Sequence, residues 1–165
     1  MERVVNQFQA IVSRLRRSAQ MKLSRLRIDT ENCPRAMAIM AEGPGRDALE
    51  AVFRDAGWRL TIADTSAPAL DPVCERLPII FYERELNRSR WREAVLLLSR
   101  LSPRPYVILL SSTSDRNLWD ELVRYGGCDI VRTPICRDAV IQAVESGWSL
   151  WLSQQRLRRA AEVRA

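Results

Sequence analysis

Short apolar runs alternate with longer amphipathic segments along the chain from Ala36 onward. Most of these runs are continuously apolar rather than alternating, which is typical of strands in a parallel sheet that is covered on both faces. We therefore predict five strands. They are Ala36–Ala41, Trp58–Ala63, Leu77–Tyr82, Tyr106–Leu110 and Cys128–Val131.

Each apolar run is followed by a segment with the periodicity of a helix. In the first such segment, Leu49, Val52 and Phe53 recur at helical spacing and Gly57 supplies a stop. Five strand-helix units predict a three-layer α/β domain whose functional edge lies at the carboxyl ends of the strands. The predicted helices are Arg46–Ala56, Ser66–Arg76, Ser89–Leu101, Ser114–Tyr125 and a last one from Asp138 onward.

Residues 1–30 precede this domain and are predicted to form a basic amphipathic helix. Its apolar side chains recur at spacings of four and three residues, which places them along one stripe. An isolated helix of this length is marginal in water, so the stripe should be buried in a packing or dimer contact. The stripe consists of Val4, Val5, Phe8, Ile11, Val12 and Leu15.

The net charge of +6 is concentrated at the two ends of the chain. Residues 1–30 carry seven cations against two acids, and residues 153–165 carry four arginines against one acid. The domain between them, residues 35–152, is therefore close to neutral, and residues 153–165 form a basic extension of the last helix. Basic ends suggest nucleic-acid contacts, but the domain shows no base-reading motif, so we expect at most weak, non-specific binding.

The composition excludes several classes of enzyme. The chain of 165 residues contains no histidine, which removes Ser-His-Asp catalysis, Cys-His catalysis and histidine-ligated zinc. The four cysteines show no C-x-x-C spacing, so we expect them to be reduced and mostly buried. No apolar run is long enough to cross a membrane, and the start of the chain lacks a signal-peptide pattern, so we expect a soluble, cytoplasmic protein.

The residues at the predicted strand ends resemble those of response-regulator receiver domains. The resemblance covers roughly residues 35–153, and three segments carry it: LPIIFYEREL at 77–86, VILLSS at 107–112 and YGGCDIVRTP at 125–134. It implies a doubly wound, flavodoxin-like sheet of five parallel strands in the order 2-1-3-4-5. The thirteen residues after Leu152 are too few for a DNA-binding output domain, so we expect no output domain there.

The resemblance also assigns a role to five positions, and most of them carry a different residue here. The phosphoryl-accepting aspartate of the family matches Glu83, and its Mg²⁺-binding acidic pair matches Ala41 and Glu42, which offer one carboxylate at most. The hydroxyl that contacts the phosphoryl group matches Ser111. The conserved lysine of the family matches Thr133, and its aromatic switch residue in the fifth strand matches Ile130.

These replacements predict a degenerate receiver with no catalytic residues. Phosphoryl transfer depends on a divalent ion and a cation that neutralise the phosphoryl oxygens, and neither is secured here. We expect no cofactor, with Mg²⁺ binding weak at best, and a role as a pseudo-receiver that signals through protein contacts, most simply as a homodimer. Two alternatives stay open: a basic nucleic-acid-associated regulator, and a weakly phosphorylated response regulator in which Glu83 either accepts the group or mimics it.

Overall fold

The computed structural model describes residues 33–63 and 77–164. Two predictions lie outside these residues: the helix of residues 1–30 with its apolar stripe, and the helix Ser66–Arg76. The remaining four predicted helices and all five predicted strands fall within the described part of the chain.

Five parallel strands form one sheet in the order β2-β1-β3-β4-β5, which confirms the predicted topology. The predicted runs coincide with the observed strands to within about two residues, the usual uncertainty of such boundaries. Glu83 and Ser111 are the last residues of β3 and β4, at the carboxyl edge of the sheet. The strands are β1 (Arg35–Ile39), β2 (Arg59–Ala63), β3 (Ile79–Glu83), β4 (Tyr106–Ser111) and β5 (Asp129–Arg132).

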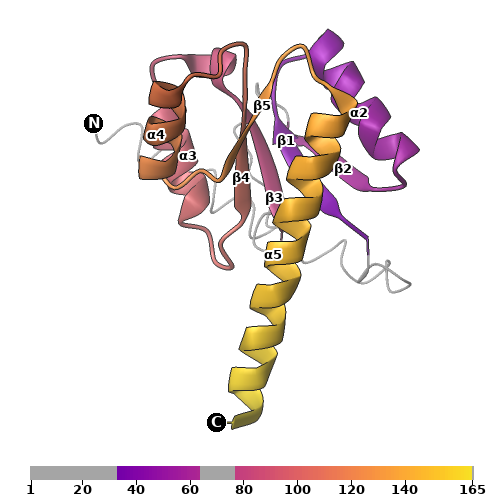
Figure 1. Ribbon diagram of the computed structural model, residues 1–165, viewed down its shortest axis with the longest axis vertical. Coiled ribbons are helices and arrows are strands. Elements are labelled where there is room, and N and C mark those ends of the chain that lie inside the picture. The colour runs from indigo at the N-terminus through magenta and orange to yellow at the C-terminus, as the bar shows by residue number, and fades with distance from the viewer. Residues whose placement is uncertain (1–32, 64–76, 165) are drawn as a thin grey trace.

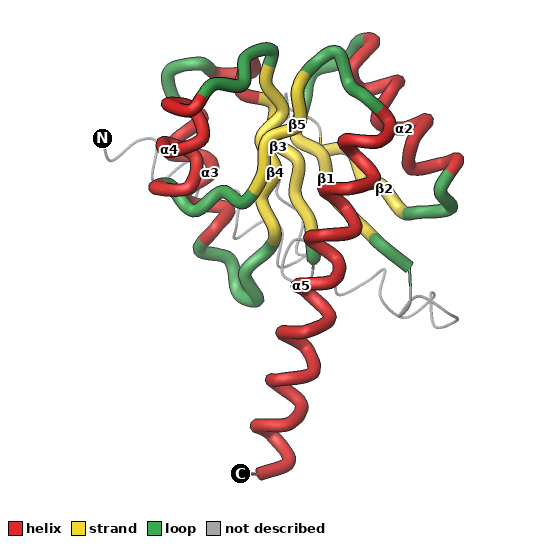
Figure 2. The backbone as a smooth tube through the Cα atoms, viewed as in Figure 1, coloured by secondary structure: helices red, strands yellow, loops and turns green. Residues whose placement is uncertain are grey.

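Helices cover both faces of the sheet (Figures 1 and 2). One core unites α2 and α5 with one side of the strands, around Phe53, Phe81 and Val144. The other unites α3 and α4 with the opposite side, around Trp91, Leu109 and Leu122. The helices are α2 (Pro44–Asp55), the short 3-10 helix η3 (Arg84–Asn87), α3 (Trp91–Ser99), α4 (Arg116–Arg124) and α5 (Arg137–Arg164).

The position of each strand in the sheet explains its burial. β3 and β4 lie in the middle and are almost entirely buried, because helices pack on both of their faces. β2 lies at the edge, where Arg59 and Thr61 are exposed. The apolar run that predicted β2 is interrupted by these two residues, as an edge strand allows.

The last helix, α5, is 28 residues long, and its two halves differ in what they contact. Its first half packs on β3 and β4, where Gly147 leaves room for the ring of Tyr106. Its second half extends beyond the body of the domain, as Figure 1 shows. Within the described residues, no helix combines the length and apolar character needed to cross a bilayer.

The burial predicted for the cysteines was wrong. Cys136 is exposed just before α5, and Cys33 and Cys128 are half-buried, although all three are free thiols. They lie in the segments that flank the strands and helices rather than on the core-facing sides of those elements. Cys74 lies outside the described residues.

Candidate functional site at the carboxyl edge of the sheet

The end of β3 is tied to the end of β1 by Glu83. Its Oε2 accepts a hydrogen bond of 2.7 Å from the backbone nitrogen of Ala41. The two strands are neighbours, with Ile39 paired to Tyr82, so their ends lie side by side. The structure thus brings together two of the residues that the sequence placed at this edge, Ala41 and Glu83.

Glu42 does not join them. Its side chain is 93% exposed and lies 3.5 Å from the guanidinium of Arg46, one helical turn further along. Arg46 also pairs with Glu50 at 3.0 Å, so the start of α2 carries a small surface network. The single acid that the sequence offered next to Ala41 therefore belongs to α2 and its surface.

An arginine that sequence reasoning missed fills the space at the end of β4. Arg84 follows Glu83 directly, and its Nη1 donates a 2.8 Å hydrogen bond to Oγ1 of Thr113. The same nitrogen lies 3.5 Å from Oγ of Ser111, the fully buried hydroxyl at the end of β4. Ser111 also accepts a 3.3 Å hydrogen bond from the backbone nitrogen of Thr113. The predicted Ser111 is therefore engaged from within its own domain.

Trp91 forms the floor on which Arg84 rests. The carbon atom at the centre of the Arg84 guanidinium lies 6.0 Å from the ring centroid of Trp91, and that of Arg92 lies 4.9 Å from it. Trp91 is fully buried at the start of α3, where it packs in the core between α3 and the sheet. Arg92 in turn donates a 2.6 Å hydrogen bond to Glu121, which joins α3 to α4.

Glu85 makes a further contact with the segment that follows β4. Glu85 accepts hydrogen bonds from both the backbone nitrogen and the hydroxyl of Ser112, at 3.1 and 2.8 Å. Burial alone would raise the pKa of Glu85, but these hydrogen bonds favour the charged form and hold the pKa below its ordinary value. The consecutive residues Glu83, Arg84 and Glu85 thus bind three different partners around the strand ends.

Known structures that are similar to this chain include response regulators and pilus assembly-related proteins. A response regulator receiver protein from Pseudoalteromonas atlantica matches with a TM-score of 0.59 at 13% identity, over 70% of this chain and 98% of its own. A response regulator from Thermotoga maritima matches with a TM-score of 0.61 at 18% identity, over 71% of this chain and 98% of its own.

The chain has the receiver-domain fold. A candidate pilus assembly-related protein from Burkholderia pseudomallei also shares it, with a TM-score of 0.61 at 17% identity over 74% of this chain and 94% of the other. No family model matches the sequence, and no curated protein matches it either. At these identities the structural likeness establishes the fold alone.

In this receiver fold, Thr133 follows β5 without supplying a cation. It is half-buried, and its backbone nitrogen donates a 3.0 Å hydrogen bond to the carbonyl of Ser111. The positive charge next to Ser111 comes instead from Arg84, on the opposite side of β4. Ile130 is half-buried against the core of α3 and α4, where it offers neither a ring nor a hydroxyl group.

The donor set at this edge does not fit Mg²⁺. Magnesium requires near-octahedral oxygen ligands, usually with one or two carboxylates. One oxygen of Glu83 is held by Ala41, Glu42 is turned to Arg46, and the guanidinium of Arg84 brings a positive charge beside Ser111. No group of three or more acidic or cysteine side chains in the described residues could hold a metal ion.

Proposed function

We propose that this protein is a phosphorylation-independent pseudo-receiver, located in the cytoplasm, that acts as a protein-protein interaction module in signalling. The single observation that carries this proposal is the position of Arg84. Its guanidinium bonds to Thr113 and lies against Ser111, at the hydroxyl which the resemblance assigns to the phosphoryl group. A receiver that responds to phosphorylation needs that hydroxyl to be available.

The chemistry of the edge supports an inert site. Phosphoryl transfer to a carboxylate requires the nucleophilic oxygen to be accessible and the phosphoryl charge to be neutralised by a metal ion and a cation. One oxygen of Glu83 is held at 2.7 Å by Ala41, and Glu42, the carboxylate next to Ala41 in the sequence, is paired with Arg46. Arg84 supplies positive charge, but it is committed to Thr113.

The same contacts favour an inert Glu83 over one that mimics a phosphorylated aspartate. A mimic would offer an oxygen to the hydroxyl of Ser111. The hydrogen bonds of the described residues direct Glu83 to Ala41 and leave Ser111 with Thr113 and Arg84. Glu83 therefore joins the ends of β1 and β3, and no hydrogen bond of the described residues links it to Ser111.

Treatment with a small phosphodonor tests this proposal. The protein is incubated with acetyl phosphate and Mg²⁺, and separately with beryllofluoride and Mg²⁺, beside a receiver that is known to respond. We expect no gain in intact mass and no change in tryptophan fluorescence, which Trp91 would report from beneath Arg84. A stoichiometric adduct that disappears in Glu83→Gln would overturn the proposal.

We further propose that residues 1–27 assemble the protein as a homodimer through the apolar stripe of residues 4–15. A domain whose sheet is already covered by its own helices does not need this stripe to close its core, and six large apolar side chains would make an unusual solvent-facing patch. Light scattering at tens of micromolar should report a dimer. The double variant Phe8→Asp, Ile11→Asp should remain folded and become monomeric. A monomeric native protein would refute the homodimer.

A further inference from the structure

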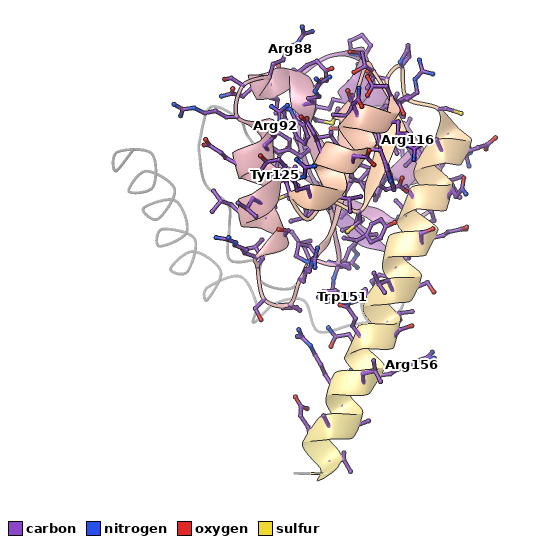
Figure 3. All side chains as sticks on the ribbon, turned by 60° about the vertical axis from the view of Figure 1, so that its left-hand side comes forward. Arg88, Arg92, Arg116, Tyr125, Trp151 and Arg156 are labelled. Carbon is purple, nitrogen blue, oxygen red and sulfur yellow. The ribbon has the colours of Figure 1, made fainter. Side chains whose placement is uncertain are left out.

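A cavity lies at the amino edge of the sheet, opposite the edge that holds Glu83 and Arg84. Its volume is about 240 Å³, and it is bounded by the starts of the strands on one side and by α5 on the other. Figure 3 shows Trp151, one of its lining residues, where α5 leaves the body of the domain. We call this hollow, between Tyr106, Cys128 and Trp151, the amino-edge cavity.

One part of the cavity wall is apolar. Trp151 and Pro105 are buried, and the ring of Tyr106 packs against Gly147. Leu150 is 47% exposed, so the cavity opens to solvent beside it. An enclosed apolar cavity of roughly 150 Å³ holds a benzene molecule. The amino-edge cavity therefore has room for one aromatic ring with a short polar substituent.

Arg104 and Gln154 add polar groups to this wall. Arg104 is exposed, and its Nη2 donates a 3.0 Å hydrogen bond to the carbonyl of Gly126. This bond fixes one end of the guanidinium and leaves its other N–H groups for a ligand. Among the described residues, no carboxylate forms an ion pair with Arg104.

Arg104 also sets the sign of the charge in the cavity. Burial, together with the nearby Asp129 and Cys128, raises the pKa of Tyr106 to about 12, and burial raises the pKa of the Cys128 thiol. Both groups are therefore uncharged at neutral pH, and Arg104 carries the only formal charge among the lining residues. Asp129 does not line the cavity, and its Oδ1 accepts a 2.8 Å hydrogen bond from the backbone nitrogen of Ile130. The ligand that complements this cavity is an anion with an apolar body.

We propose that the amino-edge cavity binds a small aromatic carboxylate. The ring lies between Trp151 and Tyr106, because contacts between aromatic rings favour an aromatic body over an aliphatic one. The carboxylate pairs with Arg104, since one guanidinium neutralises a carboxylate but only part of the charge of a phosphate. This site is separate from the carboxyl edge, so the inference holds whether or not Glu83 accepts a phosphoryl group.

A matched pair of probes tests charge and shape separately. Phenylacetate carries the ring and the carboxylate, and phenylacetamide has nearly the same shape without the charge. Each is titrated at neutral pH into the isotope-labelled full-length protein, and the backbone amide signals are followed by NMR. We expect phenylacetate to shift the signals of Cys128 and Gly147 with a dissociation constant on the order of 1 mM, at least about fivefold tighter than phenylacetamide.

Arg104→Gln identifies the cation. Phenylacetate should bind this variant about fivefold or more weakly, because the charge-assisted hydrogen bonds are lost, while phenylacetamide should bind as before. Arg100→Gln is the matched control, because Arg100 is an exposed arginine at the end of α3 that does not line the cavity. Its affinity for phenylacetate should be that of the native protein.

The thiol of Cys128 gives a second measurement on the native protein. The protein is treated with iodoacetamide in the presence and absence of saturating phenylacetate, and the alkylated peptides are quantified by mass spectrometry. Phenylacetate should slow the alkylation of Cys128 several-fold, because both occupy the same cavity. Alkylation of Cys136 should be unchanged, since this cysteine is exposed before α5 and does not line the cavity.

The outcomes decide for or against the site. Phenylacetate that causes no saturable shift at about ten times the expected dissociation constant would contradict the proposal, and so would equal affinity for the two probes. Unchanged binding in Arg104→Gln, or equal protection of Cys128 and Cys136, would overturn it as well. The comparison of the two probes on the native protein decides even where Arg104→Gln fails to fold.

Discussion

Replacing Arg84 by alanine measures how firmly the carboxyl edge is held by the domain itself. The substitution removes the 2.8 Å hydrogen bond to Thr113 and the contact with the ring of Trp91. Hydrogen bonds that involve a charged group contribute about 1.5–3 kcal/mol, and the lower end applies here because Arg84 is only half-buried. The ring contact, at 6.0 Å from the centroid, adds about 0.5 kcal/mol.

Arg84→Ala should therefore lower the free energy of unfolding by about 2 kcal/mol. Ser111 adds no further loss, because its buried hydroxyl keeps the hydrogen bond from the backbone of Thr113. Arg84→Lys should lose about half as much, since lysine keeps the charge but not the planar group that lies over a ring. Arg88→Ala is the matched control, because Arg88 is exposed just after the same 3-10 helix (Figure 3), and its effect should stay within about 0.5 kcal/mol.

Urea denaturation of the full-length protein, followed by circular dichroism and by tryptophan fluorescence, gives these free energies. The midpoint should fall in Arg84→Ala while the dependence on urea concentration stays the same. If Arg84→Ala costs no more than Arg88→Ala, the guanidinium is not held at the strand ends. The site would then not be occupied by the domain's own arginine.

Three further predictions concern packing, acid stability and the basic ends. Gly147→Ala should lower the free energy of unfolding by about 1–3 kcal/mol in a urea titration, because the added methyl group would meet the ring of Tyr106 at 2.8 Å, whereas Gly45→Ala, with no contact under 3.7 Å, should not destabilise. The pKa of Glu85 is lowered from its ordinary value of 4.5, so its charged form stabilises the fold above that pH, and this stability is lost as the pH falls through the folded-state pKa. The urea midpoint of the native protein should therefore drop more steeply than that of Glu85→Gln between about pH 5 and 3. DNA binding should be weak in a mobility-shift titration and fade between 50 and 200 mM salt, to roughly the extent expected of phosphate contacts alone, and a footprint that survives physiological salt would contradict this.

The fold was largely predictable because its strongest sequence signals come from burial. The runs that became β3 and β4 are apolar on both faces, which is typical of strands in a covered parallel sheet. α4 ends shortly before Gly126, which has a positive φ of 91° that glycine adopts readily. The start of α4 was predicted two residues early, because the helix begins at Arg116, after Asp115 caps it by accepting from the backbone nitrogen of Leu118.

The position of the candidate site was predictable, but the hydrogen-bond partners of its side chains were not. Strand periodicity placed Glu83 and Ser111 at one edge, and the structure agrees. Which partner each side chain binds depends on loop geometry that no local pattern encodes. Glu42 illustrates this, because it lies one residue beyond Ala41 and yet turns to Arg46 on α2. The run of Glu83, Arg84 and Glu85 was the available signal for these contacts. Charged side chains that directly follow a buried strand need hydrogen-bond or ion-pair partners wherever they are partly buried.

Matching residues one by one with a family therefore located the positions at which this chain differs but overlooked Arg84. The comparison assigned the missing lysine to Thr133 after β5, on one side of Ser111. The cation is present, but it reaches Ser111 from the other side, by way of Arg84 after β3. Arg84 follows β3 directly and bonds to Thr113, just after β4, so it links the ends of two neighbouring strands. At this edge Glu83 is bonded to Ala41 and Arg84 to Thr113, so the side chains that follow one another at the end of β3 bind two different neighbouring segments of the domain.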